Sequence, residues 1–450
     1  MTILPELRRV LVVSPRFPPL NSADLHRVRI SLPYFKQFGW EPHVLTVRVE
    51  PGDGLLDDAL LQTIPDDVPI HRVDALSLRR AALLGFRDVG LRAHWALYRR
   101  GLALLRQQKF DVVYFSTTAF VSTTLGPLWQ RLTGVPYVVD IHDPWRGARH
   151  FQSRLADIPG GLCKFTLKYL FLGLLERWVM GSVAHVISVS DGYFADLNAR
   201  FPRLGADRFT VLPFGASDLD FQLLSRMQVT QRFFDPGDGL IHWVYTGRSS
   251  MDMVFALRLL FCALANNRQR NPSHWERVRL HFVGTSYSPG TSGTKTVAPV
   301  AAEFGLEHVV VEYPQRVPYF EALQLLTESH GILMISSDDP FYSASKVYPL
   351  ILARRPLLGL VHRESMVADI MTKCQAGFLV RFDPANPMEH FVAEAELSLD
   401  RFLNASMSGS PVKTNWEAFM PYTAREMTRR QCLVLDQVIN EGTVELQSDE

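Results

Sequence analysis

The stretch SDDPFYSASKVYPLILARRPLLGLV, at residues 337–361, carries hydroxyl and ammonium groups that suit phosphate binding. It follows one apolar run of strand length, ends in another, and contains a helical segment between the two. Ser343, Ser345 and Lys346 lie where a polar loop opens that helix, and the free N–H groups of a helix opening favour an anion. Alternatively, Ser345 only caps the helix and Lys346 is solvated.

A second candidate lies in the N-terminal half, where His142 and Asp143 follow the apolar run Pro136–Ile141. That run predicts a strand, and ligands of open α/β sheets bind beyond the carboxyl ends of the strands. A histidine and a carboxylate placed there could hold a hydroxyl or move a proton. Alternatively, Asp143 caps the following turn and His142 is a hydrogen-bonded structural residue.

The elements that position these residues alternate between strands and helices, which predicts mainly parallel sheets with helices on both faces. The chain opens with a strand at Arg9–Ser14, a helix at Leu25–Phe38 and a strand at Glu41–Val49. This order is the usual start of a doubly wound domain, although no GxGxxG sequence follows the first strand. We therefore expect an α/β fold of two Rossmann-like, doubly wound domains.

An irregular segment near the middle of the chain, ending in DPGDG, divides the two domains. The prediction is an N-terminal domain at 1–215, a linker at 216–240 and a C-terminal domain at 241–414. A terminal helix at 415–440 is expected to cross back to the N-terminal domain, and 441–450 is expected to be a disordered tail.

An arginine-rich segment, Leu78–Gln108, has the pattern of one long amphipathic helix. Its basic and aromatic residues could lie on an anionic bilayer. They could equally belong to an ordinary surface helix whose arginines reach into solvent. Peripheral membrane contact is therefore one of two open interpretations.

Composition narrows the class of protein. The 450 residues are 47% hydrophobic and 21% charged, with a formal net charge of +1, which argues against a dedicated nucleic-acid-binding protein. The four cysteines are widely separated and form no CxxC pair, so we expect reduced thiols in a cytoplasmic protein and no metal site. No apolar stretch reaches the length of a transmembrane span without charge.

Five segments, in order along the chain, resemble motifs of GT-B glycosyltransferases of the large retaining family 4. They are SPRFPPLNSADLHRVRISLPYFKQFGWEPHVLTV, PYVVDIHDPW, ERWVMGSVAHVISVSDGYFADL, YTGR and SASKVYPLILARRPLL. The resemblance covers residues 8–440 and implies a GT-B fold, in which two Rossmann-like domains face each other across a cleft. The N-terminal domain would bind the acceptor and the C-terminal domain the nucleotide sugar.

The resemblance also implies which residues bind the donor. Gly247 and Arg248 match the turn whose arginine contacts the diphosphate of the nucleotide sugar. Lys346 would supply a second cation, and the region of Ser343 and Ser345 would supply the helix-end amides. A surface salt bridge is the structural alternative for Arg248.

On the acceptor side, the resemblance places His142 and Asp143 facing the donor sugar and the acceptor. His142 could hold a sugar hydroxyl or shuttle a proton, and Asp143 could orient it or take the acceptor proton. Asn21, Ser22 and Asp24 occupy a loop where the family often has glycines, which suggests contact with the acceptor. Asn and Ser are also common turn residues.

Three positions depart from the family pattern. Phe341 stands where the family has its first glutamate, Pro349 stands where it has the second glutamate, which holds the donor ribose, and Met253 stands where it has a lysine. Proline cannot hydrogen bond through its side chain, so ribose recognition must differ here.

The sequence therefore supports two functions. The first is a metal-independent GT-B glycosyltransferase that needs no cofactor beyond its nucleotide-sugar co-substrate and, as the resemblance implies, retains the anomeric configuration. It would act in the cytoplasm or at the inner membrane face, on a glycan such as a lipid-linked or surface-polysaccharide intermediate. The second is a non-catalytic GT-B accessory or scaffold protein with a degenerate donor site.

Overall fold

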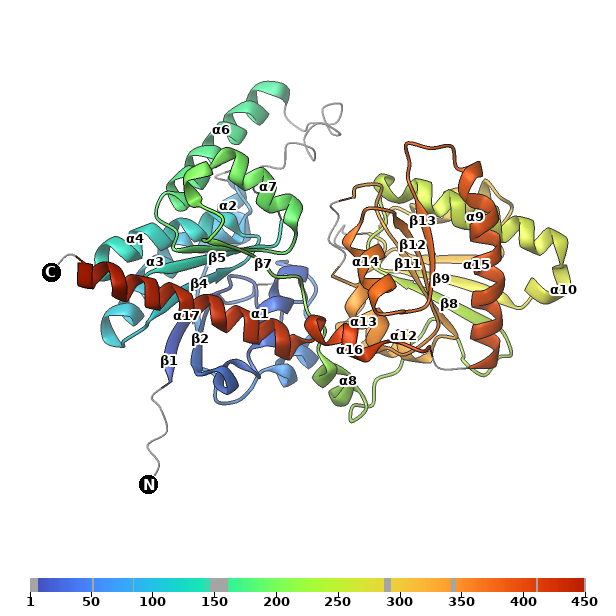
Figure 1. The fold of residues 1–450 in the computed structure, drawn as a ribbon, viewed down its shortest axis with the longest axis horizontal. Helices are drawn as coiled ribbons and strands as arrows, with labels where there is room; N and C mark the ends of the chain where they lie inside the picture. The colour runs from blue at the N-terminus through green and yellow to red at the C-terminus, as the bar shows by residue number, and fades with distance from the viewer. Residues whose placement is uncertain are drawn as a thin grey trace. The chain divides into compact units, whose positions relative to one another are not determined.

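A computed structural model describes residues 7–50, 52–83, 85–143, 145, 161–286, 293–340, 345–409 and 412–448. The chain forms two compact units (Figure 1). Unit 1 comprises Met1–Phe214 together with Ala424–Glu450, and unit 2 comprises Gly215–Thr423. Each unit is built around one parallel sheet, as the alternation of strands and helices predicted.

The sheet of unit 1 has seven strands in the order β3-β2-β1-β4-β5-β6-β7, and all of its pairs are parallel. The strands are β1 (Arg8–Val13), β2 (Trp40–Val47), β3 (Ile70–Val73), β4 (Val112–Ser116), β5 (Tyr137–Ile141), β6 (His185–Ser188) and β7 (Phe209–Val211). The order reverses between β1 and β4, and in doubly wound sheets ligands bind outside the carboxyl ends of the strands at such a point.

Unit 1 contains seven α-helices in the described residues. They are α1 (His26–Ser31), α2 (Leu78–Leu83), α3 (Val89–Gln107), α4 (Leu125–Thr133), α6 (Gly161–Met180), α7 (Asp191–Arg200) and α17 (Ala424–Ser448). Short 3₁₀ turns lie at Ala23–Leu25, Phe35–Phe38, Asp58–Thr63, Phe120–Thr124 and Pro202–Leu204.

Both faces of the unit 1 sheet are covered, which explains why its strands read as continuous apolar runs. In β1, Leu11 and Val13 join a core cluster with residues of α3 and α4. The intervening residues Val10 and Val12 are also fully buried, on the face where α17 contacts the sheet. The carboxyl ends of the strands are left to carry polar residues.

The sheet of unit 2 has six parallel strands in the order β10-β9-β8-β11-β12-β13. The strands are β8 (Ile241–Thr246), β9 (Val278–Val283), β10 (Val310–Tyr313), β11 (Gly331–Ile335), β12 (Leu357–His362) and β13 (Phe378–Phe382). The α-helices are α8 (Asp218–Leu224), α9 (Val254–Arg270), α10 (Pro272–Trp275), α11 (Ala298–Ala302), α12 (Tyr319–Glu328), α13 (Val347–Leu352), α14 (Met366–Lys373), α15 (Glu389–Ser408) and α16 (Trp416–Phe419). Met251–Met253 and Met420–Tyr422 are 3₁₀ turns.

Two predicted helices are divided in the structure. The helix expected at Leu25–Phe38 ends at Ser31, since Pro33 lacks the N–H that would continue it. The single helix expected at 78–108 is two helices, α2 and α3, separated around Gly85, whose φ of +81° is not helical. Asp88 begins α3 by accepting a hydrogen bond from the N–H of Leu91 at 3.1 Å.

The predicted domain boundaries also look different in detail. The segment expected as a linker belongs to unit 2 and contains α8, which begins at the N-cap Ser217. The terminal helix expected at 415–440 is divided into α16 and α17. The latter continues to Ser448, into the stretch expected to be a disordered tail.

Candidate active site

Lys346 is the most unusual charged residue of unit 2. It precedes α13, and its Nζ is buried without a hydrogen-bond partner among the described residues. The ammonium lies over the ring of Tyr245, 5.7 Å from the ring centroid. Burial lowers the pKa of Lys346 to about 7, and the guanidinium groups of Arg248 and Arg316 act in the same direction. A buried, unpaired ammonium among other cations is a ready partner for an anion.

Gly247 makes room for this ammonium at the end of β8. A Cβ on Gly247 would lie 1.6 Å from Lys346 Nζ, and the φ of Gly247 is +135°. A side chain at position 247 would therefore collide with Lys346 and would also adopt a rare backbone conformation. The structure thus brings together two of the residues that the sequence assigned to the donor.

Arg248 is held by the carboxylate of Asp252, 2.9 Å from Nη2 and 3.0 Å from Nη1. Its Nη1 also donates to Ser250 Oγ. Burial works to raise the pKa of Asp252, but these hydrogen bonds hold it well below its ordinary value. The salt bridge proposed as the structural alternative is present, and it also orients the guanidinium beside Lys346.

Two further residues of this region were missed by sequence reasoning. Arg316 follows β10 and is close enough to lower the pKa of Lys346, yet no local motif marks it. Asp338 follows β11, and burial together with the charge of Asp252 raises its pKa to about 6. Its Oδ1 is buried without a hydrogen-bond partner among the described residues. Asp338 lies three residues before Phe341, one of the two positions where the family has a glutamate.

The remaining donor-side predictions fall around α13. Ser343 and Phe341 lie outside the described residues, and Ser345 is exposed. Pro349 occupies the first turn of α13, where a missing N–H is tolerated. Met253, in place of the family lysine, is a core residue that is 1% exposed.

In unit 1, the centre of the site is Asp140, a carboxylate inside β5 with a fully buried side chain. Its Oδ2 lies 3.0 Å from Arg27 Nε and accepts hydrogen bonds from Tyr114 Oη at 2.5 Å and Ser116 Oγ at 3.1 Å. Burial works to raise the pKa of Asp140, but Arg27 and then His142 lower it to about 2. An acidic residue in an apolar strand must be paired, which is the sequence signal that could have identified this cluster.

His142 is anchored by the same carboxylate. Its Nε2 lies 3.1 Å from Asp140 Oδ2 and 3.0 Å from Ser116 Oγ, and its ring packs edge-on against Phe214. Its Nδ1 is buried with no hydrogen-bond partner in the described part of the chain. The ring is therefore oriented through Nε2, and Nδ1 remains able to hydrogen bond to a ligand. Asp143, the next residue, is exposed.

The loop after β1 brings Asp24 into the same region. Its Oδ2 accepts hydrogen bonds from Arg16 Nη1 at 3.0 Å and Thr118 Oγ1 at 2.8 Å, and its Oδ1 accepts one from Ser22 Oγ at 2.5 Å. Burial works to raise the pKa of Asp24, but Arg16, these hydrogen bonds and His142 lower it.

Asn21 is buried in this loop, and its N–H donates to the carbonyl of Leu55 at 2.8 Å. The three residues predicted to contact an acceptor thus lie in one loop of unit 1. One of them, Asp24, lies close enough to His142 for its pKa to be lowered by that residue.

The described residues contain no cluster of three or more His, Cys, Asp or Glu side chains placed to hold a metal ion. None of the helices in the described ranges has the combination of length and hydropathy that crossing a bilayer requires. Cys262, Cys374 and Cys432 are free thiols.

Known structures share this architecture. HepE from Anabaena, solved in complex with UDP and glucose, matches with a TM-score of 0.59 at 15% identity, over 96% of this chain and 100% of the other. A UDP-forming α,α-trehalose-phosphate synthase from Burkholderia xenovorans matches with a TM-score of 0.58 at 11% identity, over 96% of this chain and 99% of the other. The chain has the GT-B fold, which confirms the fold class predicted from its sequence.

The sequence of unit 1 also matches a known protein family. Residues 33–215 match the family described as the glycosyl transferase 4-like domain. No curated protein sequence matches the chain significantly. The family match and the shared architecture identify a glycosyltransferase of the GT-B fold.

Proposed function

We propose that this glycosyltransferase takes its sugar from a nucleoside-diphosphate sugar bound at Gly247, Arg248 and Lys346. The observation that carries the proposal is the buried, unpaired ammonium of Lys346 with Arg248 and Arg316 near it. A cluster of cations is costly until an anion neutralises it, and a diphosphate supplies at least two negative charges. The complexes of HepE with UDP and with UDP-glucose support a uridine nucleotide as the first to test.

The reaction follows from the same charges. The bond between the anomeric carbon and a diphosphate oxygen breaks, a bond to the acceptor oxygen forms, and the acceptor hydroxyl loses its proton. Negative charge grows on the departing diphosphate, and cations fixed in advance stabilise it. We infer that these side chains do this without a metal and with retention at the anomeric carbon, as the family resemblance implies.

On the acceptor side we propose that His142 holds or deprotonates a hydroxyl through Nδ1, which has no other partner in the described residues. Asp140 then acts as a positioning residue through Nε2. Asp143 is exposed next to it, and Asn21, Ser22 and Asp24 would line the acceptor. A glycan, such as a lipid-linked or surface-polysaccharide intermediate, in the cytoplasm or at the inner membrane face, is the proposed acceptor class.

The second candidate is a GT-B accessory or scaffold protein without a working donor site. Two observations favour it. Met253 is buried in the core, and the side chain of Pro349 cannot hydrogen bond to a ribose. Under this hypothesis the nucleotide would not bind.

Calorimetric titration with UDP separates the two candidates. We expect wild type to bind UDP, and Lys346→Ala to weaken the affinity at least tenfold because it removes a desolvated cation. Lys373→Ala is the matched control, since Lys373 is an exposed residue of α14, and we expect less than a twofold change.

Gly247→Ala should also weaken UDP binding, because its Cβ would displace the ammonium. Wild type that binds none of UDP, GDP, ADP, CDP and dTDP would overturn the donor-site proposal and support the scaffold.

A further inference from the structure

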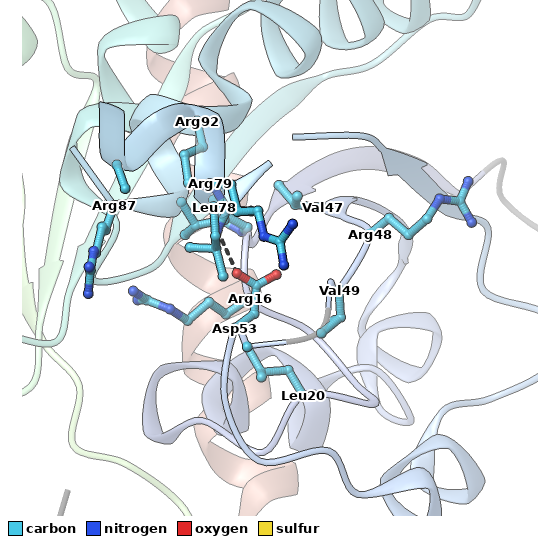
Figure 2. Close-up of a pocket in the computed structure, with 14 residues that line it drawn as sticks. Arg16, Leu20, Val47, Arg48, Val49, Asp53, Leu78, Arg79, Arg87 and Arg92 are labelled. Carbon is cyan, nitrogen blue, oxygen red and sulfur yellow. Dashed lines mark hydrogen bonds and ion pairs between the residues drawn. The ribbon is translucent and has the colours of Figure 1, made fainter. Parts of the chain in front are cut away.

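A cavity of about 450 Å³ lies at the carboxyl ends of β1 and β2 in unit 1 (Figure 2). This size is within the range of small-molecule sites. Its apolar wall includes Leu20, Val47 and Leu78, and five arginines also line it. Among the described residues of the lining, Asp53 has the only acidic side chain. None of the residues used so far to bind a donor belongs to this cavity.

Three of the five arginines have carboxylate partners. Arg92 pairs with Asp53 at 2.5 Å, and its guanidinium is nearly fully buried. Arg48 pairs with Asp74 at 2.8 Å and extends away from the other labelled side chains in Figure 2. Arg16 pairs with Asp24 in the loop after β1. These three guanidinium groups are neutralised by the protein itself.

The other two, Arg79 and Arg87, have no hydrogen bond or ion pair with any described residue. Arg79 is in the first turn of α2 and Arg87 precedes α3, so they reach the cavity from separate segments. Both are exposed to solvent at the cavity rim. Each of these guanidinium groups can donate two parallel hydrogen bonds to the oxygens of a phosphate.

The cavity adjoins the proposed acceptor loop. Arg16 lines the cavity and also donates to Asp24 and to Thr118 Oγ1, each at 3.0 Å. The pKa of Asp24 is in turn lowered by the charge of His142. A ligand in the cavity would therefore lie beside the loop of Asn21, Ser22 and Asp24, in the same unit as His142.

We propose that this cavity binds a phosphate group of the glycosyl acceptor, held by Arg79 and Arg87. The proposal rests on the proposed function, in that unit 1 binds the acceptor. It adds a chemical class, since the acceptor is a phosphate-bearing molecule with an apolar portion against Leu20, Val47 and Leu78. A neutral glycan would leave both guanidinium groups unused.

The test uses the full chain with inorganic pyrophosphate as the probe. Because pyrophosphate could also bind at Arg248 and Lys346, the reference protein carries Arg248→Ala and Lys346→Ala. This makes the measurement independent of the donor site. We expect Arg79→Ala with Arg87→Ala, added to that reference, to weaken pyrophosphate binding at least tenfold by calorimetry. Replacing both by lysine should give an intermediate loss, since lysine keeps the charge but not the paired donors.

The matched control replaces Arg80 and Arg99, which are exposed arginines of α2 and α3 outside the cavity lining. We expect their double alanine variant to bind pyrophosphate within twofold of the reference. Equal losses in both double variants would overturn the proposal, because they would reflect net charge alone. A reference protein that binds no pyrophosphate would overturn it as well, whatever UDP does with wild type.

Two further probes identify the source of the phosphate. Glucose 6-phosphate represents a soluble acceptor, and phosphatidylcholine vesicles containing phosphatidic acid represent a lipid-borne one. Loss of glucose 6-phosphate binding in the Arg79 and Arg87 variant supports the proposal with a soluble acceptor. Loss of vesicle binding in that variant, but not in the Arg80 and Arg99 variant, supports it with a lipid-borne acceptor.

Discussion

The ammonium of Lys346 and the carboxylate of Asp140 are both buried, but among the described residues only the carboxylate has partners. Arg27, Tyr114 and Ser116 surround Asp140 and keep it ionised. Lys346 is surrounded by cations and an aromatic ring, so its charge is costly in the ligand-free protein. The charges of the first arrangement are balanced within the protein, whereas the second would be stabilised by a bound anion.

UDP affinity should therefore depend on pH through Lys346. Its pKa is about 7 without ligand, and a bound diphosphate would raise it, so binding takes up a proton above pH 7. We expect affinity to fall by up to about tenfold per pH unit from pH 7 to 9, where the second phosphate ionisation is complete. Calorimetry across this range should show the slope in wild type and its absence in Lys346→Ala.

The same group has the opposite effect on the stability of the ligand-free protein. Its folded pKa of about 7 is below the ordinary 10.5, so between these values the unfolded chain binds more protons. The contribution of Lys346 to the free energy of unfolding therefore rises with pH over that window.

For UDP binding, the contradicting outcome is a pH dependence of affinity that is the same in Lys346→Ala as in wild type. That result would assign the pH dependence to another group.

Asp140→Asn should destabilise unit 1 because it leaves the Arg27 guanidinium buried without a counter-charge. Losses of about 3–5 kcal/mol are typical when one partner of a buried pair is removed. Urea unfolding would measure this. Glu41→Gln is the control, since the pair of Glu41 with Arg9 is partly exposed and should contribute less than about 1 kcal/mol. Equal losses in the two variants would contradict a special role for the buried pair.

At the scale of elements, the packing of α3 on α4 depends on a glycine. A Cβ on Gly101 in α3 would lie 2.2 Å from Trp129 Cζ2 in α4, and Trp129 is fully buried. The Trp129 Nε1 also donates to the Tyr98 carbonyl at 3.2 Å, which fixes the ring. Close approach of the two helices therefore explains a glycine in the middle of a helix.

Gly101→Ala tests which of two effects is larger. Helix propensity alone would favour alanine by about 1 kcal/mol, whereas overpacking against a fixed indole costs about 1–3 kcal/mol. We expect net destabilisation in urea unfolding, because Trp129 is fully buried and its ring is held by a hydrogen bond. In a protein that already carries Trp129→Phe, Gly101→Ala should lower the free energy of unfolding by less than it does in wild type. A stabilised Gly101→Ala protein would show that the helices can separate without cost.

At the scale of the whole molecule, the chain returns to unit 1 after completing unit 2. Asp436 of α17 accepts hydrogen bonds from Arg8 Nη1 and Trp40 Nε1, each at 2.8 Å. Gln431 accepts one from Ser31 Oγ at 3.1 Å. Unit 1 is therefore discontinuous in sequence, and its stability depends on residues beyond position 423.

Leu435→Ala should destabilise unit 1 by about 2–5 kcal/mol, since Leu435 is fully buried on α17. Hydrogen exchange should localise the effect, with faster exchange in β1 and β4 and little change in β11 and β12. Leu433→Ala is the matched control on the same helix, because Leu433 is 51% exposed and should cost less than about 0.5 kcal/mol. Faster exchange confined to unit 2 would contradict the assignment of α17 to unit 1.

The sequence by itself determined the alternating elements, the two doubly wound sheets and the strand ends at which His142 and Lys346 lie. These features are local, because apolar runs, turn residues and helical periodicity are read within a few residues of one another. The ends of helices were harder to predict from the sequence. Pro33 and Gly85 divide two predicted helices, although the apolar pattern of each segment continues past these residues.

Only the tertiary structure decided the partners. The pairing of Arg27 with Asp140, the contact of Gly247 with Lys346 and the position of Arg316 join residues far apart in the chain. The unpaired state of Arg79 and Arg87 likewise depends on which carboxylates lie near them. Such contacts are set by how strands are ordered in a sheet and how helices pack on it. The local pattern of apolar residues does not predict the order of strands in a sheet or the packing of helices on it.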